Sequence, residues 1–112
     1  MNRANPFASK RDATAPAIDA ALVAAGASVQ RLDMVGGGCP DRIVGYRGLT
    51  VLMEYKSHTT NAFTQKGKTY AYRRAASLKP AQKAWIAAWR GQPVVVVYSP
   101  EEALAAIGCV AC

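Results

Sequence analysis

Two short strand-like runs joined by a tight turn constrain the fold of this chain more than any other feature. The runs span residues 42–46 and 49–56, and only Arg47 and Gly48 lie between them. Two such runs with a two-residue connection are typical of a β-hairpin. The sequence therefore predicts an antiparallel strand pair whose register is set by this turn.

The predicted register gathers charged side chains on one face of the hairpin. Counting back from the turn sets Asp41 directly opposite Glu54. Side chains alternate along a strand, so Lys56 lies on the same face as Glu54. Like charges directly opposite each other are destabilising, and a divalent cation between the carboxylates would offset the repulsion. The face is a candidate Mg²⁺-assisted hydrolytic centre; the alternative is an ordinary hairpin with scattered charges.

The same residues resemble a known nuclease family. Pro40-Asp41, a short gap and then Glu54-Tyr55-Lys56 resemble the PD-(D/E)xK signature. The preceding glycines and the downstream Pro-x-Gln resemble small phage and bacterial members, which are related to VRR-NUC domains and more distantly to Holliday-junction resolvases. The resemblance covers about residues 12–107.

This resemblance implies both a fold and an activity. The expected fold is α/β and restriction-endonuclease-like, with a mixed central sheet of about four strands flanked by helices in the order α-β-β-β-α-β-α. The implied activity is Mg²⁺- or Mn²⁺-dependent hydrolysis of DNA phosphodiester bonds, by an endonuclease of phage or bacterial DNA processing. Resolvase-like relatives act as dimers, so a homodimer stays open.

The resemblance also assigns roles to individual residues. Asp41 and Glu54 would hold the metal, with the carbonyl oxygen of Tyr55 as a third ligand. Lys56 would orient or deprotonate the attacking water, or neutralise the phosphate. Gln82 matches the family glutamine that helps to place the lysine or the water; alternatively, it is a polar first-turn residue that satisfies backbone amides.

One part of the chain departs from the family pattern. Relatives commonly carry a glutamate in the first helix that completes the metal site, whereas here the matching positions are Ala15 and Ala17. Asp12 and Asp19 are nearby, but neither matches the position. This departure favours an alternative function, a non-catalytic nucleic-acid-binding module that keeps the nuclease fold.

The charge balance favours a polyanionic partner such as DNA. Fourteen Lys and Arg against seven Asp and Glu give a net charge of +7, although a merely basic protein would show the same excess. No apolar run approaches the roughly 20 residues of a membrane helix. The N-terminus has no apolar signal core, which predicts a cytoplasmic protein, in the bacterial host if it is phage-encoded.

Segment 57–77 is expected to be a long loop insertion beside the site. It contains no acid but has four cations and three aromatic residues, a composition that suits phosphate contacts and base stacking. The alternative is a disordered insertion whose aromatics pack locally. The predicted nucleic-acid-binding residues are Lys66, Lys68, Tyr70, Tyr72, Arg73 and Arg74.

The remaining pattern predicts one domain over residues 14–112, preceded by a basic arm at 1–13. Helices are expected at 14–25, 80–90 and 99–108, and further strands at 28–33 and 92–98. Cys109 and Cys112 have no second ligand pair nearby, so the C-terminus is expected to be an incidental tail rather than a zinc site.

Overall fold

A four-stranded mixed sheet forms the centre of the protein. The computed structural model describes residues 6–75 and 77–109, with side chains over 14–57, 64–70 and 77–109. The strand order is β1-β2-β3-β6, with antiparallel pairing except between β3 and β6, which are parallel. The strands are β1 (Ser28–Arg31), β2 (Arg42–Tyr46), β3 (Leu49–Tyr55) and β6 (Val95–Val97).

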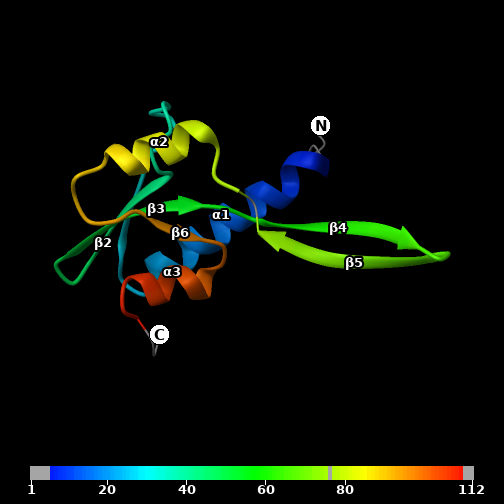
Figure 1. Ribbon diagram of the computed structural model, residues 1–112. Helices are drawn as coiled ribbons and strands as arrows, with labels where there is room; N and C mark the ends of the chain where they lie inside the picture. The colour runs from blue at the N-terminus through cyan, green and yellow to red at the C-terminus, as the bar shows by residue number, and fades with distance from the viewer. Residues whose placement is uncertain (1–5, 76, 110–112) are drawn as a thin grey trace, which may run out of the picture.

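Helices cover both faces of this sheet (Figure 1). Helices α1 (Pro6–Ala24) and α3 (Pro100–Ala106) lie on one face, and α2 (Pro80–Ala88) lies on the other. The architecture is therefore α/β with a mixed four-stranded sheet flanked by helices, as expected at that coarse level. None of the helices in the described part of the chain is long and apolar enough to cross a membrane.

The β2–β3 turn has the predicted residues and the predicted register. Arg47 and Gly48 have φ values of 48° and 81°, the two left-handed conformations that a two-residue hairpin turn requires. The pairing runs from Tyr46 opposite Leu49 to Arg42 opposite Met53. One further step along the same register sets residue 41 opposite residue 54.

Segment 57–77 is not a loop, which corrects the expectation of a loop insertion. Strands β4 (His58–Gln65) and β5 (Lys68–Ala75) pair over their whole length as a separate two-stranded sheet. Lys66 and Gly67 form its turn with φ values of 53° and 75°, the same turn chemistry as Arg47-Gly48. We call this hairpin the β4–β5 ribbon; it projects from the body of the protein (Figure 1).

The first helix begins earlier than expected. It is helical from Pro6, so the predicted basic arm at 1–13 is wrong from residue 6 onward; residues 1–5 lie outside the described part. Pro16, which was expected in the first turn, lies inside the helix. A proline there removes one backbone hydrogen bond, but the helix continues on both sides of it.

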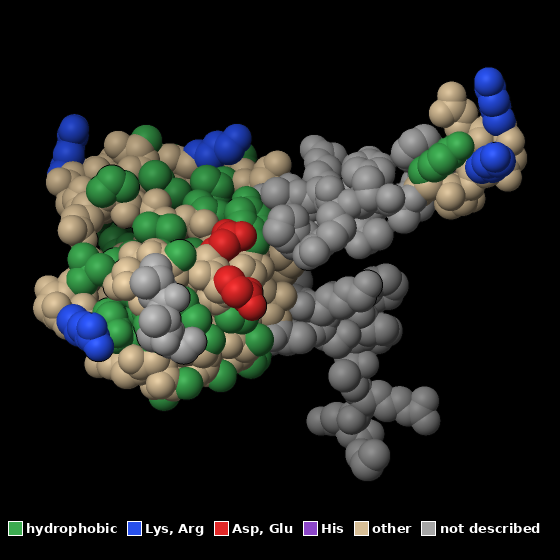
Figure 2. All heavy atoms as spheres, turned by 90° about the horizontal axis from the view of Figure 1, so that it is seen from below, with side chains coloured by type: hydrophobic (Ala, Val, Ile, Leu, Met, Phe, Trp, Pro, Cys, Tyr) green, Lys and Arg blue, Asp and Glu red, His purple; other side chains and the backbone are tan. Residues whose placement is uncertain are grey.

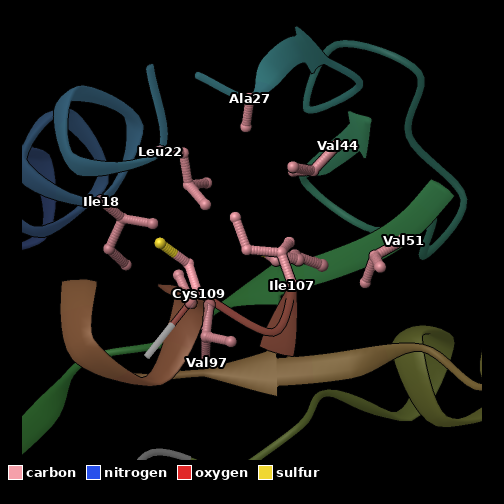
Figure 3. Close-up of a cluster of buried hydrophobic side chains, with 10 residues drawn as sticks. Ile18, Leu22, Ala27, Val44, Val51, Val97, Ile107 and Cys109 are labelled. Carbon is pink, nitrogen blue, oxygen red and sulfur yellow. The ribbon is translucent and has the colours of Figure 1, made fainter. Parts of the chain in front are cut away.

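The hydrophobic core lies between the sheet and the α1–α3 layer (Figure 3). Alternation along β2 and β3 directs Val44, Val51 and Met53 into it. Cys109 is 7% exposed there and is disulfide-bonded, so the expectation of an incidental tail is wrong for this residue; Cys112 lies outside the described residues. The buried apolar side chains are Ile18, Leu22, Ala27, Val44, Val51, Met53, Val97, Ala103, Ile107 and Cys109.

An ion pair between a buried arginine and a partly exposed aspartate ties α1 to the sheet on this core face. Arg42 is 5% exposed, and its Nε and Nη2 each donate to a carboxylate oxygen of Asp19 at 3.0 Å. The hydroxyl of Tyr55 donates to Asp19 Oδ1 at 2.8 Å, and the guanidinium lies 4.9 Å from the centre of the Tyr55 ring. A bidentate geometry of this kind offsets the cost of burying the charge.

Replacing Asp19 should therefore be costly. Asp19→Ala leaves the buried guanidinium of Arg42 without its main partner, and we expect the free energy of unfolding to fall by about 3 kcal/mol. Glu101→Ala, an exposed carboxylate in the first turn of α3, is the control and should cost less than about 1 kcal/mol. Urea denaturation followed by circular dichroism measures both, and equal losses would contradict a stabilising role for the pair.

Candidate active site

The predicted site residues meet on the face of the sheet that lies beneath α2. Glu54 belongs to β3, Asp41 immediately precedes β2, and Lys56 immediately follows β3. Because β3 alternates, Met53 points into the core while Glu54 points to the opposite face. Gln82, in the first turn of α2, reaches the same face from above.

Two carboxylates lie close together here, Glu54 buried and Asp41 half-buried. Asp41 Oδ2 accepts a hydrogen bond from the backbone N–H of Tyr55 at 2.8 Å. Glu54 is 2% exposed. Its burial, followed by the negative charge of Asp41, raises the pKa of Glu54 to about 7. The pair is therefore poorly compensated when both groups are ionised.

Lys56 provides the nearest positive charge. Its Nζ lies 3.9 Å from Glu54 Oε2, and its side chain is only 10% exposed. This charge lowers the pKa of Glu54, but less than burial and Asp41 raise it. The backbone N–H of Lys56 donates to the carbonyl of Val97 at 3.0 Å, which fixes the lysine at the end of the sheet. One lysine thus only partly balances the two acids.

Gln82 satisfies a backbone amide, as one of its two expected roles required, and its other contact is with Glu54 rather than with Lys56. Its Oε1 accepts a hydrogen bond from the backbone N–H of Lys79 at 2.8 Å, which satisfies an amide at the start of α2. Its Nε2 donates to Glu54 Oε2 at 2.7 Å. The same side chain therefore holds the start of the helix and fixes the orientation of the glutamate.

The glycine-rich loop before β2 packs against the start of α2. Gly38 has φ +87°, and a Cβ at this position would overlap the backbone carbonyl of Ala81. Only glycine permits so close an approach in this conformation. The loop thereby sets the height of α2 above the sheet, and with it the reach of Gln82 to Glu54.

The acid that is missing from the first helix is not replaced by Asp19. Both carboxylate oxygens of Asp19 are engaged by Arg42 on the core face. The side chain of Asp12 lies outside the described residues. Across the described residues, no group of three or more His, Cys, Asp or Glu side chains is arranged to hold a metal. The Tyr55 carbonyl as a third ligand stays a prediction.

A cavity that was not predicted from the sequence lies on the same face of the sheet. Its volume is about 270 Å³, and it is lined by Ile43, Thr50, Leu52, Trp89 and Gln92. Two of these residues lie two positions from a site carboxylate along their strands. The lining comes from β2, β3 and the segment that follows α2, three segments that no single sequence motif joins.

The predicted nucleic-acid-binding residues lie on the β4–β5 ribbon rather than at the carboxylates. Lys66, Lys68 and Tyr70 are exposed at its tip, where Figure 2 shows Lys or Arg side chains beside a hydrophobic one. Tyr72, Arg73 and Arg74 belong to β5, but their side chains lie outside the described part. Binding by these residues stays a prediction.

The chain matches no protein-family model, no curated protein and no solved structure.

Proposed function

We propose that the protein is a metal-dependent nuclease that hydrolyses DNA phosphodiester bonds. The observation that carries the proposal is the proximity of the Asp41 and Glu54 carboxylates, which raises the pKa of Glu54. Lys56 Nζ lies 3.9 Å from Glu54 Oε2, and the side chains of Lys56 and Glu54 are only 10% and 3% exposed. Two neighbouring acids that are removed from water and only partly compensated lower the stability of the folded state. Such arrangements cluster at functional sites.

The donor set fits a hard divalent cation. Mg²⁺ is commonly held by one or two carboxylates together with waters and substrate phosphate oxygens. One oxygen of each acid is engaged, Asp41 Oδ2 by the Tyr55 amide and Glu54 Oε2 by Gln82. The second oxygen of each carboxylate would hold Mg²⁺ or Mn²⁺. When bound, the cation would supply a water of lowered pKa and stabilise charge on the phosphate.

The protein's own groups then position the reactants. Lys56, held at the end of β3, would contact the attacking water or a phosphate oxygen. Gln82 keeps Glu54 in one orientation through its 2.7 Å hydrogen bond. Because α2 covers this face, little bulk water reaches Glu54, which strengthens every electrostatic contact there.

A second candidate is a nucleic-acid-binding module without turnover. The observation that favours it is the absence of a third acid at the site within the described residues. Such a module would keep the fold and the basic surface, and its affinity for DNA would not depend on a divalent cation. Metal-dependent cleavage is the property that separates the two candidates.

Substitutions at the site should abolish cleavage and preserve binding. We expect Asp41→Asn and Lys56→Met each to lower the cleavage rate at least 100-fold, because each removes a group that acts on the reacting atoms. DNA affinity should change little, since the charge contribution comes from the whole surface. Labelled duplex, branched and single-stranded DNA with Mg²⁺ or Mn²⁺ serve as substrates.

The control for these variants is Glu101→Gln, an exposed acid on α3 that should keep wild-type activity. If wild type cleaves none of the substrates with either ion while it still binds DNA, the binding module is the correct function. Activity that survives in Asp41→Asn would rule out the assigned centre.

The raised pKa of Glu54 makes stability depend on pH. The folded state holds a proton on Glu54 up to about pH 7, whereas the unfolded state loses it near 4.5, so stability falls as pH rises between these values. Without metal, the free energy of unfolding should fall by about 2–3 kcal/mol across this window. Mg²⁺ should restore part of it at pH 8 and little at pH 5.

Urea titrations in EDTA and in Mg²⁺ measure this linkage. Glu54→Gln cannot ionise, so it should remove most of the fall and also the effect of Mg²⁺. A wild-type protein whose stability is equal at pH 5 and pH 8 in EDTA would contradict the electrostatic description of the site.

A further inference from the structure

The two faces of the β4–β5 ribbon have different chemistry. In an antiparallel pair, residues directly opposite each other share a face, and neighbours along a strand alternate. The register runs from His58 opposite Ala75 to Gln65 opposite Lys68. Every position of the ribbon can therefore be assigned to one face or the other.

One face collects all the aromatic positions. The pairs on this face are Thr59–Arg74, Asn61–Tyr72, Phe63–Tyr70 and Gln65–Lys68. We call it the aromatic face, since its rows carry three aromatic residues together with one arginine and one lysine. The opposite face consists of the pairs His58–Ala75, Thr60–Arg73, Ala62–Ala71 and Thr64–Thr69.

The described tip of the ribbon agrees with this assignment. The hydroxyls of Thr64 and Thr69 lie 3.2 Å apart, so these two side chains share the face opposite the aromatic one. Tyr70, the next residue along β5, belongs to the other face and is 46% exposed. Lys68 is exposed as well.

The ribbon has the charge and shape of a nucleic-acid contact. It contains four cations and no acid, and it extends away from the body (Figure 1). A two-stranded hairpin is marginally stable alone in water, so a long projecting one gains most from a binding partner. In Figure 2, the acidic side chains in view lie on the body and not on the ribbon tip.

We propose that the aromatic face of the ribbon is a stacking platform for single-stranded DNA, which it presents to the carboxylate site. The substrate class rests on the proposed nuclease function, but the binding itself does not depend on metal or cleavage. Unpaired bases expose their ring faces and stack on aromatic side chains, whereas the bases of a duplex are already stacked on each other. Lys68 and Arg74 lie at the two ends of the aromatic rows and supply phosphate contacts.

The spacing and position of the ribbon favour a single strand. Successive rows on one face are two residues apart, which is about 7 Å. Duplex phosphates recur about every 3.4 Å along each strand, and an unstacked strand extends further. An extended single strand can therefore place one nucleotide on each row of the aromatic face. The ribbon begins at His58, two residues after Lys56, so a strand that leaves its base arrives beside the site.

Adjacent arginines on opposite faces provide a matched test. Arg74→Ala removes a cation from the aromatic face, and Arg73→Ala removes the same charge from the other face. Binding of a fluorescent single-stranded oligonucleotide is followed by anisotropy in EDTA over a range of salt concentrations. Arg74→Ala should weaken binding and flatten the log–log salt slope by about 0.7. Arg73→Ala, on the opposite face, should flatten the slope clearly less than Arg74→Ala.

The aromatic contribution is tested with Tyr72→Ala, which lies opposite Asn61 and so does not break an aromatic pair. We expect a loss of about 5- to 150-fold in affinity for single-stranded DNA. Duplex DNA of the same length should bind with little change between wild type and Tyr72→Ala. The control is Thr69→Ala, at a position on the face opposite the aromatic one. This variant should bind like wild type.

Two further measurements keep the result interpretable. Arg74→Lys keeps the charge and should retain the salt slope, and circular dichroism checks that each variant is folded. Equal losses for Arg73→Ala and Arg74→Ala, or equal losses on single-stranded and duplex DNA, would overturn the proposal.

A self-association of the protein, measured by sedimentation and abolished by Tyr72→Ala, would also overturn it, because the aromatic face would then join two copies of the chain. A wild type that binds as expected but never cleaves would leave this proposal standing and remove the nuclease function alone.

Discussion

The pairing of β2 with β3 is the constraint on which the rest of the structure depends. Arg47 and Gly48, both left-handed, leave one register open to these strands. In that register Val51 and Met53 face the core while Glu54 faces α2. A slip by one residue would exchange the two faces, so that a carboxylate would enter the apolar layer. Core and candidate site are thus set by a single two-residue turn.

The two faces of this sheet differ in how well a buried charge is compensated by its neighbours. On the core side, Arg42 meets Asp19 through two hydrogen bonds of 3.0 Å, and the charges balance. On the α2 side, Glu54 is as deeply buried as Arg42, but burial and Asp41 raise its pKa more than Lys56 and Lys79 lower it. The first arrangement is compensated, whereas the second is only partly so. This contrast is the reason for proposing a functional role for the second.

The features that the sequence predicted correctly are those that depend on neighbouring residues. The Arg47-Gly48 turn and strand alternation were enough to bring Glu54 and Lys56 to one face, because both rules act over neighbouring residues. Lys66-Gly67 is a two-residue turn signal like Arg47-Gly48. Segment 57–77 was nevertheless expected to be a loop, since it shows no alternation of apolar residues that would face a core. Pro16 was expected near a helix start, but a helix can continue past a proline when its remaining turns are satisfied. The cavity beside Trp89 needs three segments in space, which no local pattern specifies.

The way in which the ribbon joins the sheet has a mechanical consequence. Each of its strands is about 27 Å long, and β4 follows β3 after only Lys56 and Ser57. Lys56 is pinned by the carbonyl of Val97, and the hydroxyl of Ser57 donates to that of Thr14 on α1 at 3.4 Å. A displacement of the ribbon is therefore transmitted through Lys56 and Ser57 to β3, the strand that carries both Glu54 and the core residues Val51 and Met53.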